Sequence, residues 1–301
     1  MRAREGRAVE TLLQAVASGV LIGLVYALIS VGLSLIFGLM EIVNFAHGEF
    51  LMLAMFASFW FHLLLGLDPL VSLPLVATLL GLVGLVTNRL VIAQIIRAPM
   101  LAQIFATFGL GLFLRSVAQF LWTPDFRLIQ NPWLSRLFGG RVEIVRGVFV
   151  GVPQVAAALL AAVAFAALYL FITRTKMGLA LQAVAEDKET AALMGINSQR
   201  MFDLGWVLGS ACVGVAGAAL ASFYYIYPEV GGTFALIAYV VVALGGFGSV
   251  PGALVAGLVV GLVEILSPVM LGIAPSLKYA VVFSVYLLVV LIRPQGLMGR
   301  F

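Results

Sequence analysis

The sequence is divided into long apolar runs that contain no Asp, Glu, Lys or Arg. The runs are Thr11–Met40, Phe50–Leu67, Pro69–Asn88, Ala98–Leu114, Gly147–Thr173, Leu204–Pro228 and Val230–Val263, and a last stretch, Ile265–Ile292, is interrupted only by Lys278. A helix needs about 20 residues to cross the hydrocarbon core of a bilayer. The runs are continuously apolar, without the alternation of a membrane β-strand. The sequence therefore predicts an all-α, polytopic integral membrane helical bundle.

Composition excludes a soluble enzyme, a secreted disulfide scaffold and a disordered chain. Hydrophobic residues make up 63% of the 301 residues and charged residues 10%, whereas soluble domains average about 25% charged residues. The net charge is +4, but the basic residues lie mostly in short gaps between runs, as topology signals do, so no nucleic-acid partner is expected. The segment Met1–Glu10 resembles the start of a signal peptide. The run after it is longer than a signal h-region, which favours a retained first membrane helix.

The number of passes depends on the run Val230–Val263, which is too long for one helix. Gly and Pro residues interrupt it between Gly245 and Gly252, and at that density they break or turn a helix. We divide it into segments near 233–246 and 251–268. The prediction is a single domain, 1–301, with eight to nine transmembrane segments and at least one broken or re-entrant segment. Small residues four positions apart indicate that the helices pack closely together. The pairs are Gly19/Gly23, Gly205/Gly209, Gly248/Gly252 and Gly257/Gly261.

Basic residues indicate the orientation only in part. The polar segment Arg174–Arg200 and the C-terminal arginines can both lie on the cytoplasmic side, because four predicted passes separate them. The same count places Arg89 and Arg97 on the cytoplasmic side as well. The connection 124–146 then lies outside, although it carries Arg127, Arg136, Arg141 and Arg146. The first half of the chain is therefore ambiguous, and a re-entrant segment near 41–49 is one explanation.

Polar side chains are concentrated between the first two runs, at Glu41, Asn44, His47 and Glu49. An ionisable group at membrane depth is costly and is a functional candidate by default. An ordinary hydrated loop at the interface is the alternative, and the residues alone do not separate the two. His47 and His62 are the only histidines and lack zinc-ligand spacing, so no metal site is expected.

Two further polar features lie in the C-terminal half. The segment Leu244–Ala253 places three glycines before Pro251, which fits either a discontinuous helix that lines a polar path or a tight turn. Glu264 lies within an apolar stretch, where it either lines a pathway or pairs with a cation. Arg115 is a candidate for that cation, or it extends to an interface instead.

The segment 185–197 predicts a short helix between two membrane passes. Asp187 is a suitable N-cap, Gly195 a suitable stop, and Asn197 or Ser198 can cap the helix that follows. Such a capped helix is suited to docking a partner. A solvated connector without a partner is the simpler interpretation of these residues alone.

Four segments together resemble one family. They are Val43-Asn-Phe-Ala-His-Gly-Glu49; Arg174-Thr-Lys-Met-Gly178 followed by Ala185-Glu-Asp187 and Leu193-Met-Gly-Ile-Asn197; Leu244-Gly-Gly-Phe-Gly-Ser-Val-Pro-Gly-Ala253; and Arg293-Pro-Gln-Gly-Leu-Met-Gly299. In this order and spacing, from about residue 11 to 299, they resemble the LivH-type permeases of branched-chain amino-acid ABC importers.

The resemblance implies a multi-pass protein of the bacterial cytoplasmic (inner) membrane that imports leucine, isoleucine and valine. It also implies a second related permease, two ATP-binding cassette ATPases and an extracytoplasmic solute-binding protein as partners. The cytoplasmic coupling loop would be 174–200, and its implied coupling residues are Glu186, Asp187, Leu193, Gly195, Ile196 and Asn197. This loop departs from the general importer pattern of Glu-Ala-Ala followed by Gly, because Asp187 and Lys188 follow Glu186. The substrate-pathway candidates are Asn44, His47, Glu49, Gly245, Gly246, Gly248 and Glu264.

Other functions remain as alternatives. The same architecture would serve for urea, short amides or other small solutes, and a secondary transporter would need no ATPase. The chain has no Walker pattern, so it has no visible means of using ATP by itself, and no bound cofactor is expected. Two histidines and one cysteine, Cys212, offer no nucleophile–base or metal constellation, so we expect no catalytic residues and no enzyme activity.

Overall fold

The computed structural model describes residues 2–130, 132–145 and 147–299. Its elements are, in chain order, α1 (Arg2–Met40), α2 (His47–Leu65), α3 (Pro69–Thr87), the π-helix η1 (Asn88–Ile92), α4 (Ala93–Ile95), α5 (Met100–Trp122), α6 (Trp133–Phe138), β1 (Arg141–Val145), β2 (Val148–Gly151), α7 (Val152–Arg174), α8 (Lys176–Glu186), α9 (Lys188–Leu193), α10 (Ser198–Leu220), α11 (Val230–Gly245), α12 (Val250–Leu271), the 3-10 helix η2 (Pro275–Leu277) and α13 (Lys278–Ile292).

The helical membrane bundle predicted from the apolar runs is confirmed. Within the described residues, eight helices are long and apolar enough to cross a membrane, and α11 is a shorter apolar helix of 16 residues. The predicted division of Val230–Val263 is confirmed as well, because α11 ends at Gly245 and α12 begins at Val250.

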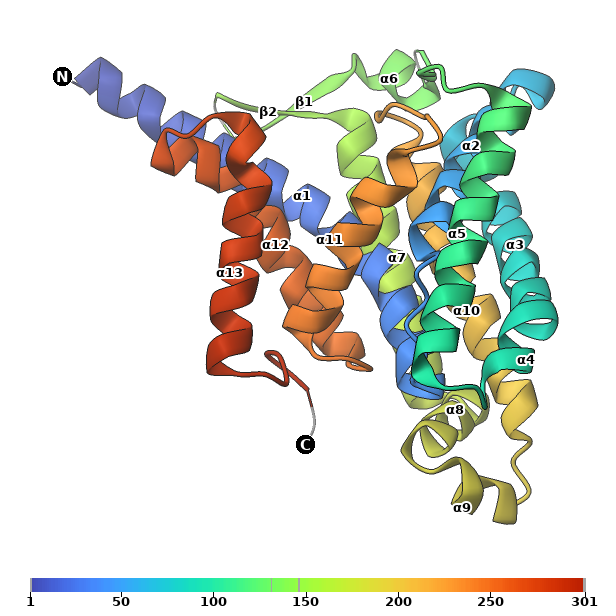
Figure 1. The fold of residues 1–301 in the computed structure, drawn as a ribbon. Coiled ribbons are helices and arrows are strands. Elements are labelled where there is room, and N and C mark those ends of the chain that lie inside the picture. The colour runs from blue at the N-terminus through green and yellow to red at the C-terminus, as the bar shows by residue number, and fades with distance from the viewer. Residues whose placement is uncertain (1, 131, 146, 300–301) are drawn as a thin grey trace.

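The connections lie on two opposite faces of the bundle (Figure 1). One face, here called the hairpin face, carries α6 and the antiparallel pair β1–β2. The other, here called the α9 face, carries α4, α8, α9 and the C-terminal segment. The structure therefore places Arg89, Arg97 and the segment Arg174–Arg200 together, opposite the connection 124–145, as the sequence count required.

Glycines allow α1 to approach two other helices closely. A Cβ added to Gly23 would lie 2.9 Å from the Gly257 carbonyl oxygen, and one added to Gly257 would lie 2.7 Å from the Ala27 backbone nitrogen. On another side of α1, a Cβ on Gly209 of α10 would lie 2.8 Å from the carbonyl oxygen of Gly32. Such contacts bring backbones together where lipid gives no hydrophobic drive for association. The predicted pairs that meet at the α1–α12 contact are Gly19/Gly23 and Gly257/Gly261.

The chain does not continue directly from α1 into another helix. After Met40 it has no regular secondary structure from Glu41 to Asn44, a stretch here called the extended segment, and it turns into α2 at His47. The His47 ring hydrogen-bonds the carbonyl oxygen of Ile29 at 2.9 Å, and Ile29 lies three turns before the end of α1. The extended segment thus returns into the interior of the bundle, and α2 begins there. The alternative of an ordinary interfacial loop is wrong for Asn44 and His47, which are both buried.

The glycine contact between α1 and α12 gives a test of this packing. We expect Gly257→Val to destabilise the fold by about 1–3 kcal/mol, because the new side chain must displace the backbone of α1. Thermal unfolding of the purified protein in detergent measures the effect. Gly109→Val in α5 is the matched control, since a Cβ at Gly109 meets nothing within 4 Å. Equal melting temperatures for the two variants would contradict the proposed close packing.

Candidate functional site

Glu49 lies in the first turn of α2, where its carboxylate is buried against α5 and α11. The Arg115 guanidinium donates to Glu49 Oε1 through Nε at 3.0 Å and also through Nη2. The side chain of Glu49 is 4% exposed and that of Arg115 is 35% exposed. No described residue donates a hydrogen bond to the second carboxylate oxygen, Oε2. The ion pair therefore leaves one buried acceptor without a donor.

The extended segment beside Glu49 is held between α5 and α11. Thr107 of α5 donates to the carbonyl oxygen of Val43 at 3.1 Å, and Tyr239 of α11 donates to that of Asn44 at 2.8 Å. The side chain of Asn44 accepts from the backbone of Ala46 at 3.1 Å, which shapes the turn into α2. These bonds provide donors for backbone carbonyl groups that would be bonded within the segment if it were helical. Of the predicted pathway residues, Asn44, His47 and Glu49 are thus brought together.

Glu264 lies elsewhere, on α12. Lys278 donates to Glu264 Oε1 at 2.6 Å, and the hydroxyl of Tyr26 donates to Oε2 at 2.6 Å, so both oxygens have donors. The possible pairing of Glu264 with Arg115 is wrong, because Arg115 pairs with Glu49. Sequence reasoning missed Tyr26 and Lys278 as partners of Glu264. Lys278 is the only lysine inside an apolar stretch, and that position could have identified it as the cation for a buried carboxylate.

The glycine-rich segment after α11 forms a tight turn. Gly246 and Gly248 have φ values of +100° and +76°, which L side chains rarely adopt. The C-terminal segment folds against this turn, and the backbone N–H groups of Leu297 and Met298 donate to the carbonyl oxygens of Leu244 and Gly245 at 2.7 and 3.0 Å. Of the two sequence interpretations, the turn is the one observed here. The role of Gly245, Gly246 and Gly248 in a pathway stays a prediction.

The helices α8 and α9 project from the α9 face (Figure 1). The predicted caps are confirmed: Asp187 accepts from the backbone of Glu189 and Thr190, and Asn197 accepts from the backbone of Arg200 at 3.0 Å. Gly195 ends the helix with φ +81°. These local bonds make α9 a short helix with defined ends.

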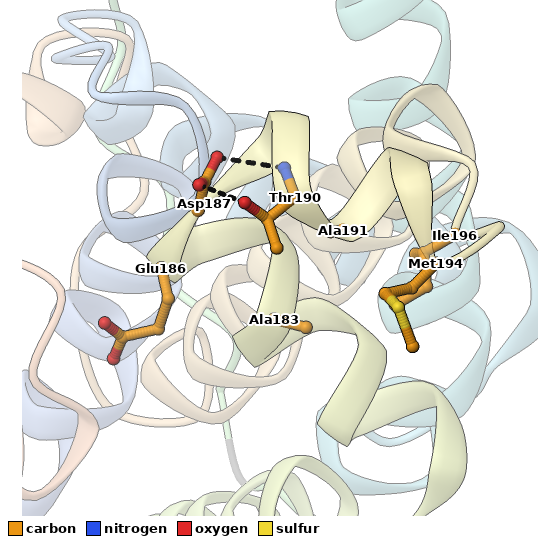
Figure 2. Close-up of a pocket in the computed structure, with 7 residues that line it drawn as sticks. All are labelled: Ala183, Glu186, Asp187, Thr190, Ala191, Met194 and Ile196. Atoms are coloured by element: carbon orange, nitrogen blue, oxygen red, sulfur yellow. Dashed lines mark hydrogen bonds between the residues drawn. The ribbon is translucent and has the colours of Figure 1, made fainter.

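One face of this projection carries exposed apolar side chains beside a pocket. Leu193 and Met194 are 88% and 79% exposed, far more than a solvated connector requires of large apolar residues. Figure 2 draws the residues that line a pocket between α8 and α9. It is lined by Ala183, Glu186, Asp187, Thr190, Ala191, Met194 and Ile196.

The carboxylate of Asp187 helps to hold this shape. The hydroxyl of Thr190 donates to Asp187 Oδ2 at 2.5 Å, and together with the backbone N–H groups of Thr190 and Glu189 it lowers the pKa of Asp187 from its usual value. Because the pKa is lowered by folding, the stabilisation is present above the unfolded value and is lost as the pH falls through the folded value. The cap is therefore intact at neutral pH.

Among the described residues, no three His, Cys, Asp or Glu side chains are grouped so that they could hold a metal ion. The ion pair of Glu49 with Arg115 joins α2 to α5, and that of Glu264 with Lys278 joins α12 to α13. An apolar projection with fixed ends lies on one face only.

Comparisons with known proteins agree with this description. A model of the family described as "branched-chain amino acid transport system / permease component" matches residues 15–291. The chain is 32% identical to the high-affinity branched-chain amino acid transport system permease protein LivH of Escherichia coli K12, over 96% of each chain. It is 29% identical to BraD of Pseudomonas aeruginosa over 96% of each, and 26% identical to a probable LivH of Methanocaldococcus jannaschii over 90% of this chain and 88% of that one. No solved structure matches.

The pair between Glu264 and Lys278 gives a test of the buried electrostatics. We expect Lys278→Met to destabilise the protein by up to about 5 kcal/mol, because Glu264 is left buried without its cation. Thermal unfolding in detergent measures the loss. The double variant Glu264→Gln with Lys278→Met removes both charges, and we expect it to recover most of the stability. A double variant as unstable as Lys278→Met alone would show that the charge is not the cause.

Proposed function

Since this chain belongs to the family of permease components of branched-chain amino acid transport systems, we propose that it forms the membrane pathway of an ATP-driven importer of leucine, isoleucine and valine. It is a transport subunit and not itself an enzyme. The family match over residues 15–291 is the observation that carries this conclusion. The exposed, capped projection on the α9 face supports it, because a permease without an ATPase of its own needs a surface on which one can act.

We further propose that 174–200 is the coupling loop. Nucleotide-driven closure of two ATPase subunits would move α9 as a rigid body, since Asp187 caps its start and the backbone N–H groups of Met194 and Gly195 bond the carbonyl groups of its last turn. The attached helices α7 and α10 would then tilt, which favours one of two states of the bundle over the other. Leu193 and Met194 would enter an apolar cleft of the ATPase, with Glu186, Asp187, Ile196 and Asn197 around them.

The partners and location follow from the same proposal. The α9 face is the cytoplasmic side of a bacterial inner membrane, and an extracytoplasmic solute-binding protein delivers substrate to the hairpin face. A second, related permease completes the pathway. We place that pathway along the side of the bundle where the extended segment meets α5 and α11, with Asn44, His47 and Glu49 at its wall.

Reconstitution tests the function. The chain is purified with its partner permease, the ATPases and the solute-binding protein, and uptake of radiolabelled leucine into proteoliposomes is measured with ATP on the α9 side. ATP-dependent uptake supports the proposal. Uptake by the chain without ATPases, driven by an ion gradient, would contradict it. Uptake of urea or acetamide in preference to leucine would show that the substrate is a small amide and not a branched-chain amino acid.

The turn at Gly195 gives a prediction about coupling. We expect Gly195→Pro to reduce leucine uptake at least 10-fold, because Pro cannot adopt φ +81° and removes the N–H that bonds Ala192. Membrane insertion should be unchanged, since the residue is in a loop outside the bundle. Uptake and ATPase activity are measured on the same vesicles. Gly272→Pro is the control, because Gly272 has φ +61° and lies beyond α12 on the hairpin side. Normal uptake and normal ATPase assembly in Gly195→Pro would contradict the assignment of 174–200 as the coupling loop.

The exposed apolar side chain of Leu193 gives a second prediction. We expect Leu193→Glu to weaken binding of the ATPase subunits at least 10-fold while leaving the melting temperature unchanged, because the side chain is 88% exposed. Copurification and titration with the ATPase measure the binding. Leu137→Glu is the matched control, since Leu137 is an exposed leucine of α6 on the hairpin face. Equal ATPase binding by both variants would exclude α9 as the docking element.

A further inference from the structure

We propose that Glu49 and Arg115 form a binding site for the charged α-amino and α-carboxyl groups of the transported amino acid. The inference rests on the proposed function and names the groups that would recognise its substrate. In the structure the two side chains bind each other; in the loaded state the carboxylate of the amino acid binds Arg115, and its ammonium group binds Glu49.

The first argument is the unused oxygen of Glu49. Both donating nitrogens of Arg115 reach Oε1, and no described residue donates to Oε2, which is buried. A buried carboxylate oxygen without a donor is costly, and it is the acceptor that an ammonium group needs. By contrast, Glu264 has a donor on each oxygen. Of these two acidic side chains, only Glu49 has a carboxylate oxygen that receives no hydrogen bond from a described residue, so only Glu49 can accept a further cation.

The second argument is the exposure of Arg115 at its depth. Arg115 lies seven residues before the end of α5, or about 10 Å from it at 1.5 Å per residue. Its side chain is 35% exposed there. An arginine at that depth faces protein or a water-filled cavity, not acyl chains. The exposed part of Arg115 therefore needs water, another protein surface or a polar solute beside it.

The third argument is the close approach of the α11 backbone to the pair. Gly231 and Gly232 lie at the start of α11, and a Cβ on Gly231 would come within 2.8 Å of Glu49 Oε2. A Cβ on Gly232 would lie 3.4 Å from Arg115. Because both positions are glycine, the α11 backbone packs closely beside the pair and adds no side chain between the two charged groups and a ligand. One turn of α5 closer to the hairpin face, Gln119 donates to Glu229 at 2.5 Å, so further polar groups line the approach from that side.

Apolar surface lies on the other side of the pair. A Cβ added to Gly111, one turn of α5 before Arg115, would lie 3.3 Å from the Cα atom of Ala46. The neighbouring Phe45 is exposed, and its ring packs 5.4 Å from that of Tyr239, measured between centroids. A zwitterion held by the ion pair would direct a branched aliphatic side chain toward these rings. The site and its ligand are both neutral overall, so loading it needs no counter-ion.

The first experiment uses the reconstituted complex with its ATPases and solute-binding protein. We expect Glu49→Gln and Arg115→Gln each to lower the maximal rate of leucine uptake at least 10-fold. The KM for the loaded solute-binding protein and the basal ATPase activity should stay within 2-fold. The reversed pair, Glu49→Arg with Arg115→Glu, restores a salt bridge but inverts its polarity, and we expect it to stay inactive. Arg89→Gln is the matched control, because Arg89 also forms an interhelical ion pair, with Asp203, near the α9 face.

Recovery of uptake by the reversed pair would overturn the inference, since it would show that the bridge serves packing alone. A second measurement needs no variant. Radiolabelled leucine is bound to the detergent-purified wild-type complex, with leucinol, which lacks the carboxylate, and 4-methylpentanoate, which lacks the ammonium group, as competitors. We expect each to compete at least 10-fold more weakly than leucine. Equal competition, or no saturable binding, would overturn the inference. Failure of the wild-type complex to carry leucine would instead overturn the proposed function.

Discussion

Direct backbone contact between helices at glycine positions is the constraint on which this bundle depends. In lipid, apolar side chains gain little by leaving their surroundings for one another, so association requires close packing. The contacts of Gly23 with Gly257 and of Gly32 with Gly209 hold α12 and α10 against α1. With α1 fixed at the centre, the extended segment that follows Met40 is enclosed by other helices, and its carbonyl groups obtain donors from α5 and α11.

The parts of the structure that were predictable from the sequence are those that local chemistry determines. The length of an apolar run sets a membrane helix. The break near Gly246 follows from the density of Gly and Pro, and the caps at Asp187 and Asn197 follow from side chains that bond amides two or three residues away. Each of these features depends on neighbours in the chain, so one sequence was sufficient to place them.

The pairing of charges was not predictable in the same way. Arg115 was equally compatible with Glu264, and its actual partner, Glu49, is 66 residues away in the sequence. The bond from Tyr26 to Glu264 joins residues 238 apart. Such pairs depend on how each helix is rotated about its axis and on which helices are neighbours. Apolar runs that are hydrophobic on every side carry little information about either.

The bonds from Leu297 and Met298 to the end of α11 have a mechanical consequence. They tether α11, through a short non-helical strap, to α13, a helix that is largely unburied within this chain. A tilt of α11 at its lower end would therefore pull α13 along, so the two helices would behave as a single lever. Motion that begins near the bundle axis would in this way reach its lipid-facing periphery.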